Sequence, residues 1–294
     1  MRKLYKHFYS MASSSCGNEI FACILLSFLY VGSLYIWTGS RGRDHPSTIK
    51  KRCASVFFMT IISPFFVVYF LNEETREKAT LPQLLGIRYD GVILSAILPL
   101  LLTVILFLGP IIQNHQNIPL NSTLLIYLQP RYWYNSSQNP IWWRNQVVAP
   151  FSEEFTFRAC MLPLLLQCLS PMSAIFVAPL FFGIAHLHHA IDRVKLGLPF
   201  TTVVIVSFFQ FVYTSLFGFY SAFLFLRTGQ FLPLFIVHAF CNHMGLPEIR
   251  ELFNKPEKQR NKLVAFHALG LIAWYLLLFP LTEPSWYSNE LYSL

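Results

Sequence analysis

The segment VILSAILPLLLTVILFLGPII, residues 92 to 112, runs for 21 positions without a charged side chain. An α-helix crosses the hydrocarbon core of a bilayer with about 20 predominantly apolar residues. The segment therefore predicts a membrane-spanning helix. Comparable segments recur along the whole chain, so we expect a fold with several membrane-spanning helices.

The overall composition agrees with a membrane protein. Of 294 residues, 54% are hydrophobic, 17% are aromatic and only 12% are charged, whereas soluble domains contain about 25% charged residues. The 29 Phe residues and the mean hydropathy of +0.48 exceed what a water-facing fold of this size can bury. The net charge of +8 lies in short stretches between apolar runs, so we attribute it to membrane topology and not to nucleic-acid binding.

We expect an all-α, polytopic membrane protein with eight transmembrane helices, folded as one domain over residues 1–294. Five segments are regular and apolar: about 20–37, 53–71, 92–112, 199–226 and 263–281. The first is too long for a cleaved signal peptide and is interpreted as a retained span. Three others are shorter or interrupted by polar residues, and they contain nearly all the ionisable residues inside spans: about 146–169, 171–186 and 231–245.

The cysteines show no spacing typical of a metal site or a redox motif, and most lie inside apolar runs. We therefore expect them to be reduced packing residues. They are Cys16, Cys23, Cys53, Cys160, Cys168 and Cys241.

The distribution of Lys and Arg predicts the orientation of the chain. Loops after the first, third, fifth and seventh spans hold 14 of the 22, the termini and remaining loops hold seven, and Arg158 lies inside a span. Because cytoplasmic loops carry excess Lys and Arg, we expect these odd-numbered loops in the cytosol and both termini in the lumen. The glycosylation sequons at Asn121 and Asn135 then face the cytosol and stay unmodified.

The fourth span contains Glu153, Glu154 and Arg158. Each charge near the bilayer centre costs roughly 2.5–3.5 kcal/mol, so three in one helix need a compensating interaction. Glu154 and Arg158 are four positions apart and can pair on one helical face. Glu153 is rotated by about 100° from Glu154, and a desolvated carboxylate of this kind suits a general base. The alternative is a charge network that only anchors helices.

Two further polar groups lie on the fifth and seventh spans. The fifth ends in His186, followed by His188 and His189 near the membrane boundary. In the seventh, His238 and Asn242 lie four apart and can donate hydrogen bonds to a developing oxyanion. The alternatives are interfacial or packed histidines and a polar clasp between helices.

The predicted topology brings these three groups to one side of the membrane. The fourth span starts at the cytosolic side, and the fifth and seventh spans end there. All three groups therefore lie at a similar depth near the cytosolic face, as an active site requires.

These motifs, in this order, resemble the three signature motifs of the type II CAAX prenyl endopeptidase family, in particular its eukaryotic members of the endoplasmic reticulum. The motifs are Glu153-Glu154-x-x-x-Arg158, Phe182-x-x-x-His186 and His238-x-x-x-Asn242. The strong match covers a catalytic core of about residues 142–246, and the first 140 residues agree only in hydropathy.

The resemblance implies an intramembrane glutamate protease with its site facing the cytosol from the endoplasmic reticulum membrane. Such an enzyme removes the last three residues from farnesylated or geranylgeranylated CAAX proteins, for example Ras-type small GTPases. The implied partners are these prenylated proteins and the lipid bilayer, with no cofactor and no nucleic acid.

The resemblance also implies a role for each motif residue. Glu153 and His186 would bind and activate the attacking water. His238 and Asn242 would stabilise the oxyanion. The other two would orient the site and balance its charge: Glu154 and Arg158.

Two other enzyme classes stay open at this stage. Glu153, His186 and His238 offer donors for Zn²⁺, although the chain has no H-E-x-x-H motif. Cys241, three residues after His238, offers a nucleophile for a cysteine protease.

A non-enzymatic interpretation also stays open. Carboxylates and histidines inside spans relay protons in transporters or hold helices together in scaffolds. The chain shows no inverted repeat, and its charges lie near one face instead of the midplane, which favours the enzyme.

Overall fold

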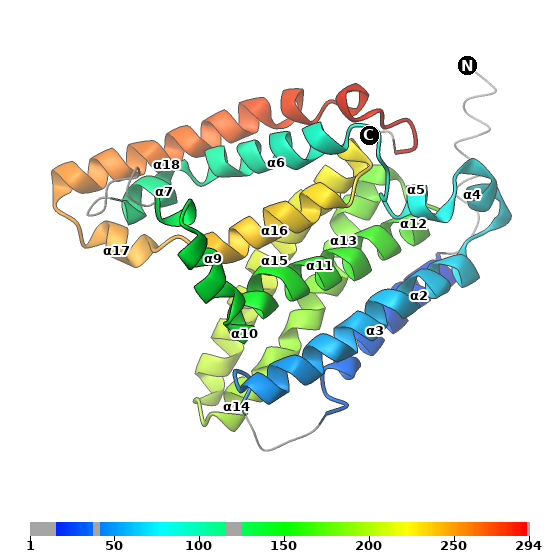
Figure 1. Cartoon of the computed structure of the whole chain (residues 1–294), viewed down its shortest axis with the longest axis horizontal. Coiled ribbons are helices and arrows are strands. Elements are labelled where there is room, and N and C mark those ends of the chain that lie inside the picture. The colour runs from blue at the N-terminus through cyan, green and yellow to red at the C-terminus, as the bar shows by residue number, and fades with distance from the viewer. Residues whose placement is uncertain (1–15, 38–41, 116–124, 293–294) are drawn as a thin grey trace.

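The computed structural model describes residues 16–37, 42–115 and 125–292. Over these ranges the regular structure is helical, with no β-strand, as the sequence predicts. The helices run as tilted rods across the molecule, and several short helices cover their ends (Figure 1). The Asn121 sequon and the basic residues at the start of the chain lie outside the described ranges.

Helices occur where the eight apolar segments predict them. The longer helices are α2 (Gly17–Ser33), α3 (Pro46–Phe70), α6 (Val92–Leu106), α13 (Pro171–Ala185), α15 (Phe200–Thr228), α16 (Leu232–Met244) and α18 (Glu257–Leu278). The shorter helix α7 (Leu108–Asn114) directly follows α6. The short ones are α4 (Glu73–Lys78), α5 (Leu81–Leu84), α9 (Pro130–Ser137), α10 (Pro140–Trp143), α11 (Ala149–Glu154), α12 (Met161–Leu165), α14 (His189–Lys195) and α17 (Ile249–Phe253).

Within the described residues, four helical stretches are long and apolar enough to span a membrane: α3, α13 continued through α14, α15 and α18. A fifth is obtained if α6 and α7 count as one span. Helices α2 and α16 are apolar but shorter. The multi-pass membrane fold is therefore confirmed, and the count of eight spans and the single-domain organisation stay predictions.

The segment at residues 92–112 does not form one straight helix. Helices α6 and α7 meet at an angle of 66°. Pro110 lies in the first turn of α7, and its ring clashes with the carbonyl four residues earlier, which disfavours a continuous helix. Gly109 permits the close approach of α18, because a Cβ there would lie 2.3 Å from the His267 ring.

The fourth predicted span is also interrupted, and protein surrounds it. Two π-helical turns, η1 (Arg144–Val148) and η2 (Phe155–Cys160), flank α11, and α12 follows. The stretch 154–165 is buried throughout. Because neighbouring helices replace lipid around this segment, it can carry charges that a lipid-exposed helix cannot. π-Turns inside helices are frequent at functional sites.

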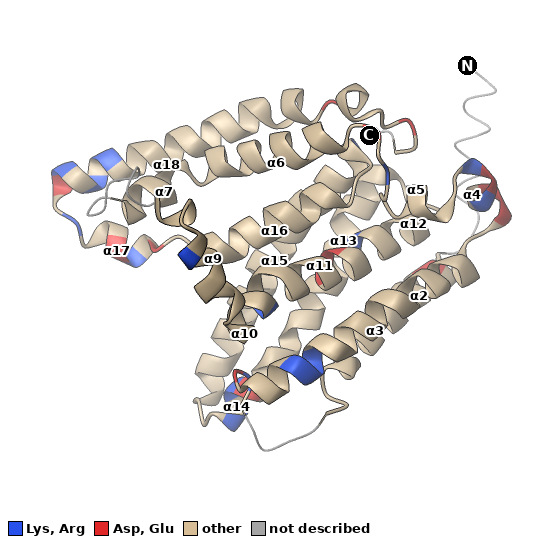
Figure 2. Cartoon of the chain, viewed as in Figure 1, with Lys and Arg blue, Asp and Glu red and all other residues tan. Residues whose placement is uncertain are grey.

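Large apolar side chains cover the outer surface of the bundle, as a lipid-facing surface requires. Phe28, Phe65 and Phe208 are 74%, 70% and 66% exposed. Charged residues gather at the ends of the helices, whereas the acidic turn of α11 lies among tan helices in the interior (Figure 2). This separation identifies α11 as the position where charge is held inside the bundle.

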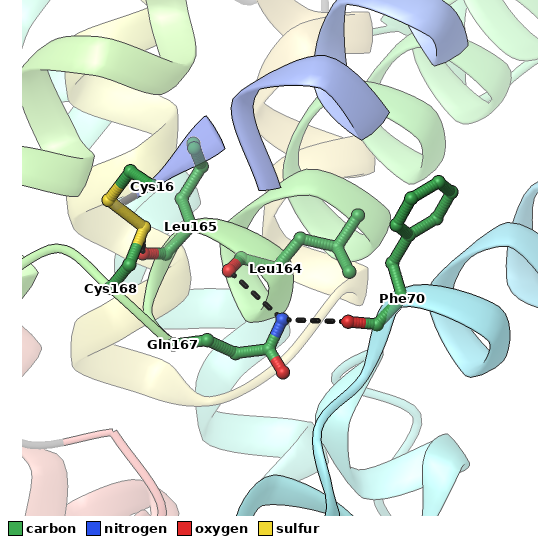
Figure 3. Close-up of a disulfide and its surroundings, with 6 residues drawn as sticks. All are labelled: Cys16, Phe70, Leu164, Leu165, Gln167 and Cys168. Carbon is green, nitrogen blue, oxygen red and sulfur yellow. Dashed lines mark hydrogen bonds between the residues drawn. A yellow bond between two sulfur atoms is a disulfide. The ribbon is translucent and has the colours of Figure 1, made fainter. Parts of the chain in front are cut away.

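The prediction that all cysteines are reduced is wrong for two of them. Cys16 and Cys168 form a disulfide, with Cα atoms 5.5 Å apart, that ties the start of α2 to the end of α12 (Figure 3). Gln167 reinforces this junction by donating to the Phe70 carbonyl at 3.2 Å. The partners are separated by 152 positions, so local spacing gives no sign of the pairing. The other four cysteines are free: Cys23, Cys53, Cys160 and Cys241.

Candidate active site

A cavity of about 90 Å³ lies between α2, α3, α11 and the end of α13. It has room for several water molecules. Its apolar lining is Val31, Leu34, Cys53, Val56, Val148, Ala149, Phe157, Phe182 and Ala185, and its polar lining is Tyr30, Arg43, Arg52, Arg144, Ser152, Glu153, His186, His188 and His189. We refer to it below as the pocket.

Glu153 projects from α11 into the pocket. Its side chain is 19% exposed, and Oε2 lies 3.8 Å from Nε2 of His238. Next to it in the sequence, Ser152 accepts a hydrogen bond from the Tyr30 hydroxyl at 2.9 Å while donating to the Val148 carbonyl. These bonds connect α11 to α2 and fix the turn that presents Glu153.

Glu154 points away from the pocket into the interior. Its carboxylate accepts hydrogen bonds from Arg158 at 3.1 Å, from the Ser221 hydroxyl at 2.5 Å and from Nδ1 of His238 at 2.7 Å. The Glu154 and Arg158 side chains are both fully buried. The predicted pairing of these two residues is confirmed, and we call Glu154, Arg158, Ser221 and His238 the inner cluster.

Two aromatic rings also pack against the Arg158 guanidinium. Its Cζ lies 4.1 Å from the centre of the Phe182 ring and 5.8 Å from that of Phe217. Such cation–π contacts compensate for lost hydration. Space for the guanidinium depends on Gly218, where a Cβ would lie 2.7 Å from Nη2 of Arg158.

His186 caps the end of α13 and lines the pocket with Glu153. Its Nδ1 donates to the Phe182 carbonyl at 2.8 Å. With Nδ1 protonated in this way, Nε2 of the neutral ring is the acceptor. Phe182 therefore links the two regions, because its carbonyl orients His186 and its ring packs on Arg158.

His238 lies between the two carboxylates and is 7% exposed. Nδ1 faces Glu154 and Nε2 faces Glu153. Asn242, one turn further along α16, is exposed and outside the pocket lining, and its Nδ2 donates to the Asn145 carbonyl at 2.9 Å. The structure thus brings five of the six motif residues together and leaves Asn242 at the edge of the group.

The sequence interpretation missed the positive side of the pocket. From the sequence, Arg43, Arg52 and Arg144 were used only to predict the orientation of the chain in the membrane. In the structure, all three line the pocket. Arg144 pairs with Asp44 at 2.7 Å, and this hydrogen-bonded guanidinium holds the pKa of the Asp44 carboxyl below its usual value. The only sequence signal was the concentration of basic residues between positions 41 and 52.

Cys241 is half-buried on α16 and does not line the pocket. Among the described residues, no group of three or more His, Cys, Asp and Glu side chains is arranged to hold a metal ion.

Comparison with known proteins places the chain among peptidases. The family model described as "Type II CAAX prenyl endopeptidase Rce1-like" matches residues 135–244, the part that contains all six motif residues. No solved structure matches the chain.

Curated relatives match nearly the whole chain. It is 43% identical to CAAX prenyl protease 2 of Homo sapiens over 278 residues, which cover 93% of this chain and 84% of the relative. It is 39% identical to CAAX prenyl protease 2 of Rattus norvegicus, covering 93% and 83% of the two chains. Identity to the Saccharomyces cerevisiae protein of the same name is 32%, covering 76% and 78%.

Proposed function

Since the chain belongs to the type II CAAX prenyl endopeptidase family, we propose that it hydrolyses the peptide bond after the prenylated cysteine of CAAX proteins. The products are the released C-terminal tripeptide and a protein that ends in the prenyl-cysteine. Farnesylated and geranylgeranylated proteins, including Ras-type small GTPases, are the proposed substrates. The substrate class follows the name that the relatives carry.

One observation carries the proposed mechanism: Glu153 on α11 and His186 at the end of α13 line the same cavity, which has room for water. A carboxylate oxygen and an imidazole Nε2 are both acceptors, so a water molecule between them can donate one proton to each. This arrangement holds the water and makes its oxygen more nucleophilic.

In the proposed reaction, the water oxygen attacks the carbonyl carbon of the scissile bond while Glu153 accepts a proton. Collapse of the tetrahedral intermediate breaks the C–N bond, and the proton passes to the departing amine. His238, whose Nδ1 is held by Glu154 and whose Nε2 faces Glu153 at the edge of the pocket, is the proposed hydrogen-bond donor to the developing oxyanion.

The remaining motif residues support these groups. Glu154 and Arg158 orient His238 from the buried side. Asn242 uses one amide N–H to bond the Asn145 carbonyl, and its second N–H is the proposed oxyanion donor. No resident cofactor enters this scheme.

The disulfide supports a pocket that faces the cytosol. Disulfides persist in oxidising compartments such as the endoplasmic reticulum lumen and are rare in the cytosol. Cys16 precedes α2, whereas Tyr30 at the other end of α2 lines the pocket. With the Cys16–Cys168 junction in the lumen, the pocket lies toward the cytosolic side, in agreement with the count of basic residues.

The test is release of the tripeptide from a farnesylated CAAX peptide and from its unprenylated twin, by membranes that contain wild type or Glu153→Gln at matched protein level. We expect cleavage of the prenylated peptide only. We expect Glu153→Gln to lower the rate by about 10²–10⁴-fold, the usual contribution of a general base.

Glu257→Gln, a substitution of an exposed carboxylate at the start of α18, is the matched control and retains wild-type activity. Equal cleavage by Glu153→Gln and wild type would remove Glu153 from the mechanism. Failure of wild type to cleave either peptide would bring the transporter or scaffold interpretation forward.

A further inference from the structure

The pocket contains more positive charge than the proposed water attack requires. Arg43 approaches from the segment before α3, Arg52 from the second turn of α3, and Arg144 from the start of η1. Among the lining residues that the structure describes, Glu153 is the only carboxylate. The proposed scheme already assigns the oxyanion to His238 and Asn242 and gives none of these three guanidinium groups a role.

The three arginines differ in their partners. Arg144 is neutralised by Asp44, and its Nε donates to Asn145 Oδ1. Neither Arg43 nor Arg52 forms an ion pair with any described residue, and the buried Nε of Arg52 has no hydrogen-bond partner.

The surroundings of Arg52 hold its guanidinium in place without neutralising it. Its Cζ lies over the Tyr35 ring at 5.5 Å from the centroid, and the Tyr35 hydroxyl donates to the His188 carbonyl. Asp192 is the nearest acidic residue on α14, and it lies 3.8 Å from Nδ1 of His189 instead of pairing with Arg52. A cation that is oriented, half-buried and unpaired is suited to an anionic ligand.

The proposed substrate supplies such an anion. A CAAX protein ends in a free α-carboxylate, and three residues separate that carboxylate from the prenyl-cysteine. An extended residue spans about 3.3–3.6 Å, so the carboxylate lies roughly 10 Å from the scissile bond. Glu153 on α11 and Arg52 on α3 line the same cavity from different helices, so one substrate can contact both.

We propose that Arg52, assisted by Arg43, binds the terminal α-carboxylate of the substrate and thereby fixes the cleavage point three residues from the chain end. This inference rests on the proposed function and adds a specificity determinant to the same site. Arg52 acts as a positioning residue, because it contacts the end of the substrate and not the reacting atoms. Arg144 keeps Asp44 as its partner and leaves the other two guanidiniums free for the ligand.

The experiment compares two farnesylated peptides that differ only at the C-terminus, one with a free carboxylate and one with a carboxamide. Each is assayed with wild type, Arg52→Gln and Arg52→Lys. Wild type is expected to cleave the carboxylate peptide about 10–100-fold better in kcat/KM, the usual effect of one hydrogen bond to a charged group. Arg52→Gln loses this preference by slowing only the carboxylate peptide, and Arg52→Lys, which keeps the charge without the planar fork, is intermediate.

Lys51→Gln is the matched control, because it removes a positive charge at the adjacent position without touching the pocket. It retains the full carboxylate preference. A third peptide, extended by one residue beyond the CAAX end, is cleaved poorly by wild type, since its carboxylate is displaced by about 3.5 Å.

The outcomes separate this inference from the proposed function. Equal cleavage of the carboxylate and carboxamide peptides by wild type overturns the carboxylate site and leaves the endopeptidase activity intact. A loss in Arg52→Gln that is equal for both peptides overturns it as well, because that pattern indicates a structural role. If wild type cleaves neither peptide, the proposed function itself fails.

Discussion

Glu153 and Glu154 are consecutive in the sequence and have opposite surroundings. Glu154 accepts three hydrogen bonds in the inner cluster and has no exposed side-chain surface. Glu153 faces a cavity, its side chain is 19% exposed, and among the described residues it forms an ion pair only with His238, at 3.8 Å. A rotation of about 100° between neighbouring helix positions is enough to produce this difference.

This contrast distinguishes a carboxylate that stabilises the fold from a carboxylate that is available for chemistry. A buried carboxylate with all its partners present has little capacity left for a ligand or a water molecule. A carboxylate with open acceptor sites beside a cavity has that capacity. Substitutions in the inner cluster are therefore expected to change stability first, and substitutions in the pocket to change activity first.

The largest change in activity is expected at His186, and it distinguishes His186 from His188 in the same pocket. His186→Ala removes the second water-binding group and lowers tripeptide release by about 10²–10⁴-fold with unchanged thermal stability. His188→Ala stays within a few-fold of wild type, because His188 packs against Tyr35 and its Nδ1 bonds the Ala185 carbonyl. Steady-state kinetics on a farnesylated peptide check both variants. A larger loss in His188→Ala than in His186→Ala would reverse the assignment.

The inner cluster is tested by removing one partner and then both. Arg158→Met leaves Glu154 as a buried carboxylate without its cation and is expected to destabilise the protein by about 3–5 kcal/mol. The double variant Glu154→Gln with Arg158→Met regains part of this stability, since no uncompensated charge remains. Thermal unfolding in detergent micelles measures both. Equal melting temperatures for the double variant and Arg158→Met would contradict the pairing.

The next largest loss of stability is expected when the Cys16–Cys168 disulfide is removed. Cys16→Ser removes a crosslink between positions 152 residues apart and is expected to cost about 2–4 kcal/mol. The folded fraction keeps its activity because the junction lies at the far end of α2 from the pocket. Unfolding of wild type with and without reductant provides the reference. Reductant that leaves the wild-type transition unchanged would show that the two cysteines are not joined in the membrane.

A smaller effect is expected from the contact between α15 and the inner cluster. Gly218→Ala forces a Cβ to within 2.7 Å of Arg158 Nη2 and of the Pro179 side chain, with an expected cost of about 1–3 kcal/mol. Gly32→Ala in α2 is the control, because no atom lies within 4 Å of the added Cβ. It leaves the melting temperature unchanged or slightly raised. A larger loss in the control than in Gly218→Ala would contradict the packing argument.

Chelator treatment is expected to have no effect. The proposed reaction uses Glu153 and His186 to activate water, so tripeptide release continues after prolonged dialysis against a strong chelator. The measurement is the rate before dialysis, after dialysis and after addition of Zn²⁺. Activity that disappears and returns with Zn²⁺ would favour the zinc interpretation of Glu153, His186 and His238.

Much of the fold could be predicted because hydropathy is a local property. The positions of α3, α15 and α18 follow from apolar runs that match the bilayer thickness. The bend between α6 and α7 was not predicted, although Pro110 was a local signal for it. The π-turns around α11 were not predicted either, because no local sequence pattern distinguishes them from α-helix. The pairing of Glu154 with Arg158 was predictable, since a spacing of four fixes one helical face.

Three properties follow from the sequence alone: the helical membrane fold, the placement of Glu153 and Glu154 on different faces of one helix, and the family to which the chain belongs. These properties depend on composition, helical periodicity and the order of three motifs. The pairing of Cys16 with Cys168 and the position of Arg43 and Arg52 in the pocket with Glu153 depend on the tertiary structure. Such contacts join residues about 100 or more positions apart, and no local period encodes which distant helix will pack beside which.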